Sequence, residues 1–311
     1  MEEETKEKTS VFNKLKKIYD KQYKKLLIIP FLILLLAIVQ IGIQQATTGD
    51  FLNKGVSLKG GITLTIPTET ADVITLEKKL LEDFPQHDIS VRSLNKAGSQ
   101  VGVIIEADID TENQQEVNSF LDDIEYSLNL KKGDYIIELI GSSLGKSFFR
   151  EAFFALFLAF IFMGIVVFLY FRTFAPSAAV ILAALSDIIV TLAIVNLIGI
   201  KLSTAGIAAF LMLIGYSVDT DILLSTKVLK RKEGTVMERI FGAMKTGLTM
   251  SVTTIIAVTV ALIFTQSEVI KQIMTILLIG LLVDLINTWI QNVGILRLYI
   301  DRKHKKVGHT E

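Results

Sequence analysis

Six long apolar runs constrain this chain more than any other feature of its sequence. The hydrocarbon core of a bilayer is about 30 Å thick, so a helix that crosses it needs about 20 predominantly apolar residues. Runs that meet this requirement lie at 26–43, 152–171, 176–198, 203–224, 247–264 and 270–296. The sequence therefore predicts an integral membrane protein with six spanning helices.

The first run could be the apolar core of a signal peptide, but its surroundings favour an uncleaved anchor. The 25 residues before it carry acids as well as lysines, and no small-residue cleavage pattern follows it. Short connections join the second run to the third, the third to the fourth and the fifth to the sixth. These connections predict helical hairpins.

Basic residues beside the runs predict the orientation, because Lys and Arg favour the cytoplasmic side of a membrane. Residues 1–25 carry eight basic side chains, the loop 227–245 carries six, and the tail from Arg297 carries five. With six spans, these three regions share one side. The long loop at 44–150, with 10 basic and 17 acidic side chains, falls on the other side. We therefore expect a multi-pass protein of the cell membrane with both termini in the cytoplasm.

The long loop has the pattern of a small folded domain. Strand-type and helix-type runs follow one another in the order β-α-β-β-α-β, at 56–66, 71–84, 89–94, 101–107, 112–128 and 135–140. This order is that of the ferredoxin-like motif, which supports an architecture and not a function. The predicted fold is a membrane all-α bundle of six transmembrane helices, with one extracytoplasmic α+β ferredoxin-like domain between helices 1 and 2. Its parts are a cytoplasmic basic N-terminus at 1–25, helix 1 at 26–43, the domain at 44–150, helices 2–6 at 151–298 and a cytoplasmic tail at 299–311.

Residue types that serve catalysis or metal binding are scarce. The chain has no cysteine, and its three histidines (His87, His304 and His309) all lie in hydrophilic stretches. Gly141 to Ser147 resembles a phosphate-binding loop, but only three residues separate its glycines where that motif needs four. We interpret Gly141 and Gly145 as a flexible joint between the domain and the membrane. The sequence predicts no metal, no cofactor and no enzymatic activity.

Acidic residues inside the apolar runs are the candidates for function. A charge at the centre of a bilayer costs at least about 2.5–3.5 kcal/mol, so a carboxyl there is a functional candidate by default. Asp187 and Asp284 lie near the middle of their runs, and Asp219 and Asp221 lie in one half of the fourth. Lys245, at the entrance of the fifth run, is the nearest basic residue. These five residues are our candidates for a proton or ion relay.

Helical spacing groups other residues of the runs into packing faces. Gly280, Asp284, Asn287 and Gln291 step by four, three and four, so they share one face of a helix. A polar stripe of this length faces protein or water and not lipid. Small residues let helices approach closely. The residues that we assign to helix packing or to a partner interface are Gly206, Gly215, Gly280, Asn287 and Gln291.

Plainer interpretations of the same residues stay open. Asp219 and Asp221 are two positions apart, about 200° around a regular helix, so both cannot point into one cavity. Either of them is also consistent with a water-exposed interface position. Asp187 is consistent with a neutral, hydrogen-bonded acid in a helix contact. The polar stripe is consistent with simple attachment between helices.

Several motifs together resemble those of a known family. The fourth run contains GYSVDTDILL, and motifs elsewhere are Gly60-Gly61, Leu144-Gly145-x-Ser147, Leu185-Ser186-Asp187 and Met250-Ser251-Val252-Thr253-Thr254. With the layout of one span, a domain and five spans, the chain resembles the archaeal SecF branch of the SecD/SecF family, within the resistance-nodulation-division superfamily. Bacterial members carry an acid where Thr220 stands, an arginine near Lys245 and a small residue where Asp284 stands. Asp187 alone aligns with them without an offset.

The resemblance implies a role in protein export. It implies pairing with a SecD-like subunit, contacts with the Sec translocon channel, with secreted protein chains and with membrane lipids, and no binding of nucleic acid. It also implies use of the ion gradient to promote export. A rival interpretation is half of a small-molecule or lipid exporter of the same superfamily, but such pumps carry larger domains and two fused halves. A membrane-anchored scaffold, the third interpretation, has no need of four intramembrane aspartates.

Overall fold

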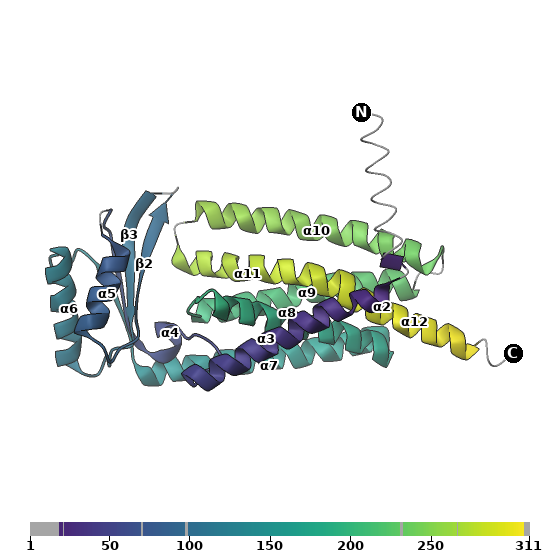
Figure 1. The fold of residues 1–311 in the computed structure, drawn as a ribbon, viewed down its shortest axis with the longest axis horizontal. Coiled ribbons are helices and arrows are strands. Elements are labelled where there is room, and N and C mark those ends of the chain that lie inside the picture. The colour runs from purple at the N-terminus through teal and green to yellow at the C-terminus, as the bar shows by residue number, and fades with distance from the viewer. Residues whose placement is uncertain are drawn as a thin grey trace, which may run out of the picture.

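The structure is a computed structural model that describes residues 19–20, 22–69, 71–96, 99–230, 233–265 and 267–307. A long helical bundle carries a small sheet unit at one end (Figure 1). Most of the predicted basic N-terminus and the last four residues of the predicted tail lie outside the described residues.

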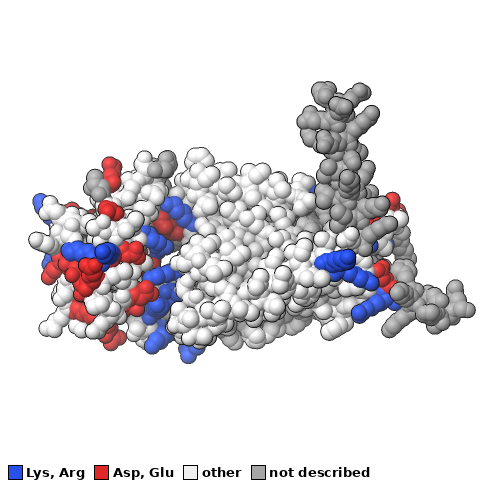
Figure 2. Space-filling model, in the orientation of Figure 1, with Lys and Arg blue, Asp and Glu red and all other residues white. Residues whose placement is uncertain are grey.

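The described residues contain six helices that are long and apolar enough to cross a membrane, as predicted. The first combines the single turn α2 (Tyr23–Leu26) with α3 (Ile28–Thr48). The next four are α7 (Ser142–Phe171), α8 (Phe174–Leu197), α9 (Thr204–Lys230) and α10 (Val236–Phe264). The sixth comprises α11 (Glu268–Ile286), a π-helical segment η1 (Asn287–Asn292) and α12 (Val293–Val307). Figure 2 shows a band without charged side chains over the bundle, with charged side chains gathered at both of its ends.

Two of these helices begin well before the apolar run that predicts them. Helix α10 starts at Val236 because Thr235 and Glu238 form a capping box that satisfies the free backbone N–H groups of its first turn. Helix α7 starts at Ser142, two residues after the last strand of the sheet ends. Hydropathy locates the part of a helix within lipid, whereas polar residues outside the apolar run, such as the capping box of α10, decide where the helix begins.

The sheet unit has four strands in the order β2-β3-β1-β4, and every neighbouring pair is antiparallel. Its elements are the short α4 (Val56–Lys59), β1 (Gly61–Ile66), α5 (Val73–Asp83), β2 (Ile89–Lys96), β3 (Ser99–Ala107), α6 (Gln114–Leu128) and β4 (Ile136–Ile140). One face carries the core, in which alternate strand residues such as Leu64 and Ile105 pack against Leu80 of α5 and Phe120 of α6. The strand and helix order β-α-β-β-α-β is therefore present as predicted.

The first strand begins later than the sequence predicts. Val56 to Lys59 form a helical turn and not a strand, and β1 starts only at Gly61. Gly60 and Gly61 have φ angles of +94° and +133°, which turn the chain sharply between the two elements. Only glycine adopts such angles without strain. The apolar residues at 56 and 58 are both buried, but in a helical turn. Their alternation with polar residues is the pattern of a strand, which explains the wrong prediction.

One set of tight backbone contacts joins the sheet unit to the start of α7. Gly145 lies in the first turn of α7, and a Cβ atom there would come within 2.6 Å of the backbone nitrogen of Gly60. Gly141 is the N-cap residue of the same helix. The two glycines that we assigned to the joint thus lie where the unit joins the bundle, and the close packing at Gly145 restricts movement there.

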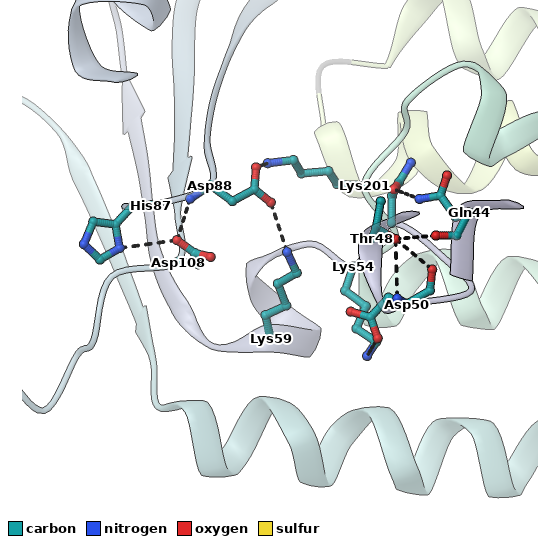
Figure 3. Close-up of polar contacts among 10 residues, drawn as sticks. Gln44, Thr48, Asp50, Lys54, Lys59, His87, Asp88, Asp108 and Lys201 are labelled. Carbon is teal, nitrogen blue, oxygen red and sulfur yellow. Dashed lines mark hydrogen bonds and ion pairs between the residues drawn. The ribbon is translucent and has the colours of Figure 1, made fainter. Parts of the chain in front are cut away.

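A carboxylate makes a second, polar contact between the unit and the bundle (Figure 3). Asp88 lies between two lysines, with Oδ1 2.8 Å from Lys201 Nζ and Oδ2 3.0 Å from Lys59 Nζ. Lys201 belongs to the turn between α8 and α9, so this ion pair ties the sheet unit to the membrane helices. A further contact joins Lys271 Nζ to the carbonyl oxygen of Asn95, at 3.2 Å.

We expect the Asp88 contact to weaken in acid. Burial of the carboxyl acts to raise its pKa, but hydrogen bonds and charge from Lys201 and Lys59 outweigh this effect and hold the pKa below its usual range. A lowered pKa in the docked state means that the contact is complete above the ordinary aspartate pKa and is lost as the pH falls through the lowered value. Asp88→Asn should mimic the acid state at neutral pH, at a cost of about 1 kcal/mol or less because the pair is half-exposed.

Hydrogen exchange at β2 provides the measurement for this prediction. Exchange should be faster in Asp88→Asn than in the unaltered chain at neutral pH, and the difference should shrink in acid. Glu82→Gln is a matched control, because it removes a surface ion pair with Lys78 inside the sheet unit. Equal exchange in the Asp88 variant and this control would show that the contact does not hold the unit in place.

Candidate functional site

Three aspartates from three different helices meet inside the bundle. Asp187 comes from α8, Asp221 from α9 and Asp284 from α11, and each is 0% exposed. The hydrogen bonds to their carboxyl groups come from hydroxyl and amide side chains. We refer to these three residues as the carboxyl cluster.

Asp187 is fixed by hydrogen bonds from two other helices. Ser217 of α9 donates its hydroxyl proton to Oδ2, and Asn287 Nδ2 of η1 donates to Oδ1 at 2.7 Å. Both oxygens therefore have a neutral donor. The carboxyl position depends on the packing of α8, α9 and η1 together.

Asp221 and Asp284 share one hydroxyl group. Thr288 Oγ1 lies 3.0 Å from Asp221 Oδ1 and 3.0 Å from Asp284 Oδ1. A hydroxyl has a single proton to donate, so it cannot donate to both carboxylates at once. Both contacts are hydrogen bonds only when one of the two carboxyls carries a proton and donates it to the threonine. The geometry thus suits a shared proton.

The π-helical segment supplies most of the donors. Besides Asn287 and Thr288, it contributes Asn292, whose Nδ2 donates to Asp221 Oδ1 at 2.7 Å. Gln291 Nε2 donates to Ser186 Oγ, beside Asp187, at 3.1 Å. π-Helical turns occur often at functional sites. In a regular α-helix, the adjacent residues Gln291 and Asn292 point about 100° apart, yet here both reach partners within the bundle.

Several buried oxygen atoms of the site have no partner among the described residues. They are Oδ2 of Asp221, Oδ2 of Asp284, Oε1 of Gln291 and Oδ1 of Asn292. A buried oxygen without a donor is unfavourable by about 1–3 kcal/mol. A proton held by one of the carboxyls would supply a donor to one of these oxygens.

Comparisons with known proteins identify the family. Residues 123–302 match the family described as "Protein export membrane protein SecD/SecF, C-terminal". The chain is 39% identical to the protein-export membrane protein SecF of Pyrococcus furiosus, with 94% of this chain and 96% of that one covered. The corresponding figures for SecF of Methanocaldococcus jannaschii are 40%, 92% and 99%.

The chain belongs to the SecD/SecF family of protein-export membrane proteins.

Among solved structures, the chain is similar to SecDF, a translocon-associated membrane protein from Thermus thermophilus. The TM-score is 0.71 at 18% identity, over 92% of this chain and 41% of that one. At this identity the likeness concerns the fold. The chain thus spans less than half of the SecDF chain, although it spans nearly the whole length of the two SecF relatives.

In this SecD/SecF family member, the structure separates the candidate relay residues into two groups. Asp187, Asp221 and Asp284 form the carboxyl cluster, whereas Asp219 and Lys245 lie on exposed faces of α9 and α10. Among the proposed packing residues, Gly206, Gly280, Asn287 and Gln291 are buried inside the chain's own bundle, and Gly215 is exposed.

Sequence reasoning missed four polar residues of the site, namely Ser186, Ser217, Thr288 and Asn292. Spacing could have found two of them, because Ser217 lies four residues before Asp221 and Thr288 four residues after Asp284, each on the same helix face. Ser186 is the direct neighbour of Asp187 and accepts a hydrogen bond from Gln291 of the same π-helical segment that holds Asp187. Asn292 reaches the site through the π turn, for which hydropathy gives no signal.

Proposed function

We propose that this chain is a SecF-type accessory subunit of the Sec protein translocase, which works with a SecD-type partner to promote protein export by means of the ion gradient. The observation that carries this proposal is the combination of SecF relatives along nearly the whole chain with a buried cluster of three carboxyls inside the bundle. The rival interpretation as a small-molecule or lipid exporter is not favoured, because the relatives are named as protein-export membrane proteins.

The carboxyl cluster is the proposed relay. An acid at membrane depth that exchanges a proton or a small cation can couple its passage to helix movement, as carboxyl chains do in pumps and transporters. Asp187 is the central member, since both of its oxygens are fixed by donors that come from other helices. No enzymatic step is part of this role.

The proposal extends to the placement in the membrane. Both termini lie in the cytoplasm, and the sheet unit is a ferredoxin-like domain on the opposite side. There it would meet secreted chains and the Sec channel, with lipids around the bundle. The basic residues at the ends of the spans support this orientation.

One exposed face of α9 is the proposed surface for the SecD-type subunit. Met212, Gly215 and Asp219 lie along this face, and Met212 is 54% exposed. An acid at bilayer depth faces protein or water and not lipid. The bound subunit would therefore cover Asp219, and Gly215 would let its helix approach closely.

Co-purification tests both the function and this surface. Among the described residues, a Cβ atom on Gly215 meets no atom within 4 Å beyond its chain neighbours and the nearby backbone of its own helix, so Gly215→Leu should fold normally. It should nevertheless block the approaching helix and lower the amount of SecD-type subunit recovered with tagged protein by about tenfold, a change of about 1.4 kcal/mol. Gly42→Leu on α3 is the matched control, since its Cβ is equally unhindered. Full recovery of the SecD-type subunit with Gly215→Leu would exclude this face as the interface. If the unaltered chain recovers no second subunit, the pairing itself is rejected.

A further inference from the structure

Helices α9 and α11 pack along a common face, which we call the seam, and its character changes with depth. On α11, Gln272, Ile276, Gly280 and Asp284 step by four residues and therefore share one side of the helix. Both ends of this row are polar, and its middle is not. The seam thus leads from the sheet-unit end of the bundle to the carboxyl cluster.

The end of the seam near the sheet unit is open and polar. Gln272 accepts a hydrogen bond from the hydroxyl of Ser203 and donates to the carbonyl oxygen of Lys201 at 2.6 Å. Beside it lies a cavity of about 300 Å³, whose lining includes Ser203, Gln272 and Thr275 together with charged residues such as Arg92 and Glu268. Such a volume is large enough for several water molecules.

The middle of the seam is closed by apolar packing. A Cβ atom on Gly280 would lie 2.5 Å from Leu213 Cδ2, so the leucine side chain fills the notch that the glycine leaves. Leu213 and Ile276 are both 0% exposed. Water or a cation cannot cross this layer without losing its hydrogen bonds.

Directly below this layer the polar groups of the site begin. Ser217 follows Leu213 by one turn on α9, and Asp284 follows Gly280 by one turn on α11. Ser217 donates to Asp187, so one leucine side chain separates the notch from the carboxyl cluster. Leu213 is the member of this apolar layer that lies nearest to the cluster, and the glycine opposite it gives space that no larger residue would give.

We propose that the seam is the path by which protons or small cations reach the carboxyl cluster from the sheet-unit side, and that Leu213 seated against Gly280 is the plug that closes this path. The path opens when the leucine side chain leaves the notch. The proposal rests on the relay role given to the cluster under the proposed function.

Cysteine labelling tests the path directly, because the chain has no cysteine of its own. Thr275→Cys places a thiol in the cavity, and Ser217→Cys places one below the plug. In lipid nanodiscs, a small charged thiol reagent should label the cavity thiol rapidly and the thiol below the plug slowly. Leu213→Ala or Leu213→Asn, which opens or wets the plug, should raise the labelling rate of the Ser217→Cys thiol by about tenfold or more, with no change for the Thr275→Cys thiol. Met212→Ala, next to the plug but on the exposed face, is the matched control.

Three results would overturn the proposal. The first is rapid labelling of the Ser217→Cys thiol with Leu213 in place. This measurement leaves the plug unchanged, so it tests the proposal even if both leucine variants fail to fold. The second is an unchanged labelling rate of this thiol in folded Leu213 variants. The third is an equal rise with Met212→Ala. Labelling reports access and not export, so these results stand whether or not export depends on the gradient.

Discussion

Asp187→Asn should remove the gradient-dependent part of protein export while the complex still assembles. Asparagine keeps the size of the side chain and can still accept from Asn287 and donate to Ser217, which now hold the carboxyl in place. It holds no exchangeable acidic proton in the working pH range and no negative charge for a cation. We expect the export rate of a secreted reporter, measured in vesicles with an imposed ion gradient, to fall by at least about tenfold.

Two further measurements make this result specific. Co-purification with the SecD-type subunit should be unchanged, which separates loss of the relay from loss of the complex. Asp187→Glu, which keeps a titratable group, should retain part of the gradient dependence. Normal gradient-dependent export with Asp187→Asn would leave this residue with a packing role only.

Deletion of Ile290 should abolish gradient-dependent export to a similar extent. A π turn contains one residue more than the regular helix needs, and removal of a residue within it restores the α-helical pattern. Ile290 is the residue of η1 that is partly exposed, so its loss leaves the core packing least affected. The shortened helix cannot direct all four polar side chains of η1 inward. At least one buried donor is lost, with a destabilisation of about 1–3 kcal/mol.

Thermal unfolding and the export assay measure the two effects together. Ile290→Ala serves as the control, because it removes the same side chain but keeps the π turn. Its export should remain close to that of the unaltered chain. If the deletion variant folds, assembles and exports normally, the π turn has no part in the function.

The features that followed from the sequence are those that depend on strong local physics. Each of the six apolar runs corresponds to a helix, because a segment of about 20 apolar residues within lipid must satisfy its backbone hydrogen bonds internally. Spacing alone also indicated that Asp219 and Asp221 could not share a cavity, and the structure has one exposed and the other buried. Which of the two points inward depends on how α9 packs against its neighbours, and a single helix carries no such information.

The features that did not follow depend on contacts between distant segments. Val56 and Leu58 have the look of a strand, but a pair of glycines at positive φ ends their element before β1 begins. By the spacing of a regular helix, Asn292 lies off the polar stripe, so the sequence did not predict its part in the site. The extra residue of η1 is stabilised by hydrogen bonds to α9 and α8, and those partners are 71 and 100 positions away along the chain.

The junction between β4 and α7 has a mechanical consequence. Strand β4 ends at Ile140 and α7 begins at Ser142, while β4 is bonded along its length to β1. Gly145 packs directly on the backbone before β1. The segment that leads from β4 into α7 is therefore held against the segment that leads into β1. No flexible linker separates β4 from α7, so this junction cannot absorb a displacement of the sheet unit. A displacement of the sheet unit would therefore pass directly to the first turn of α7.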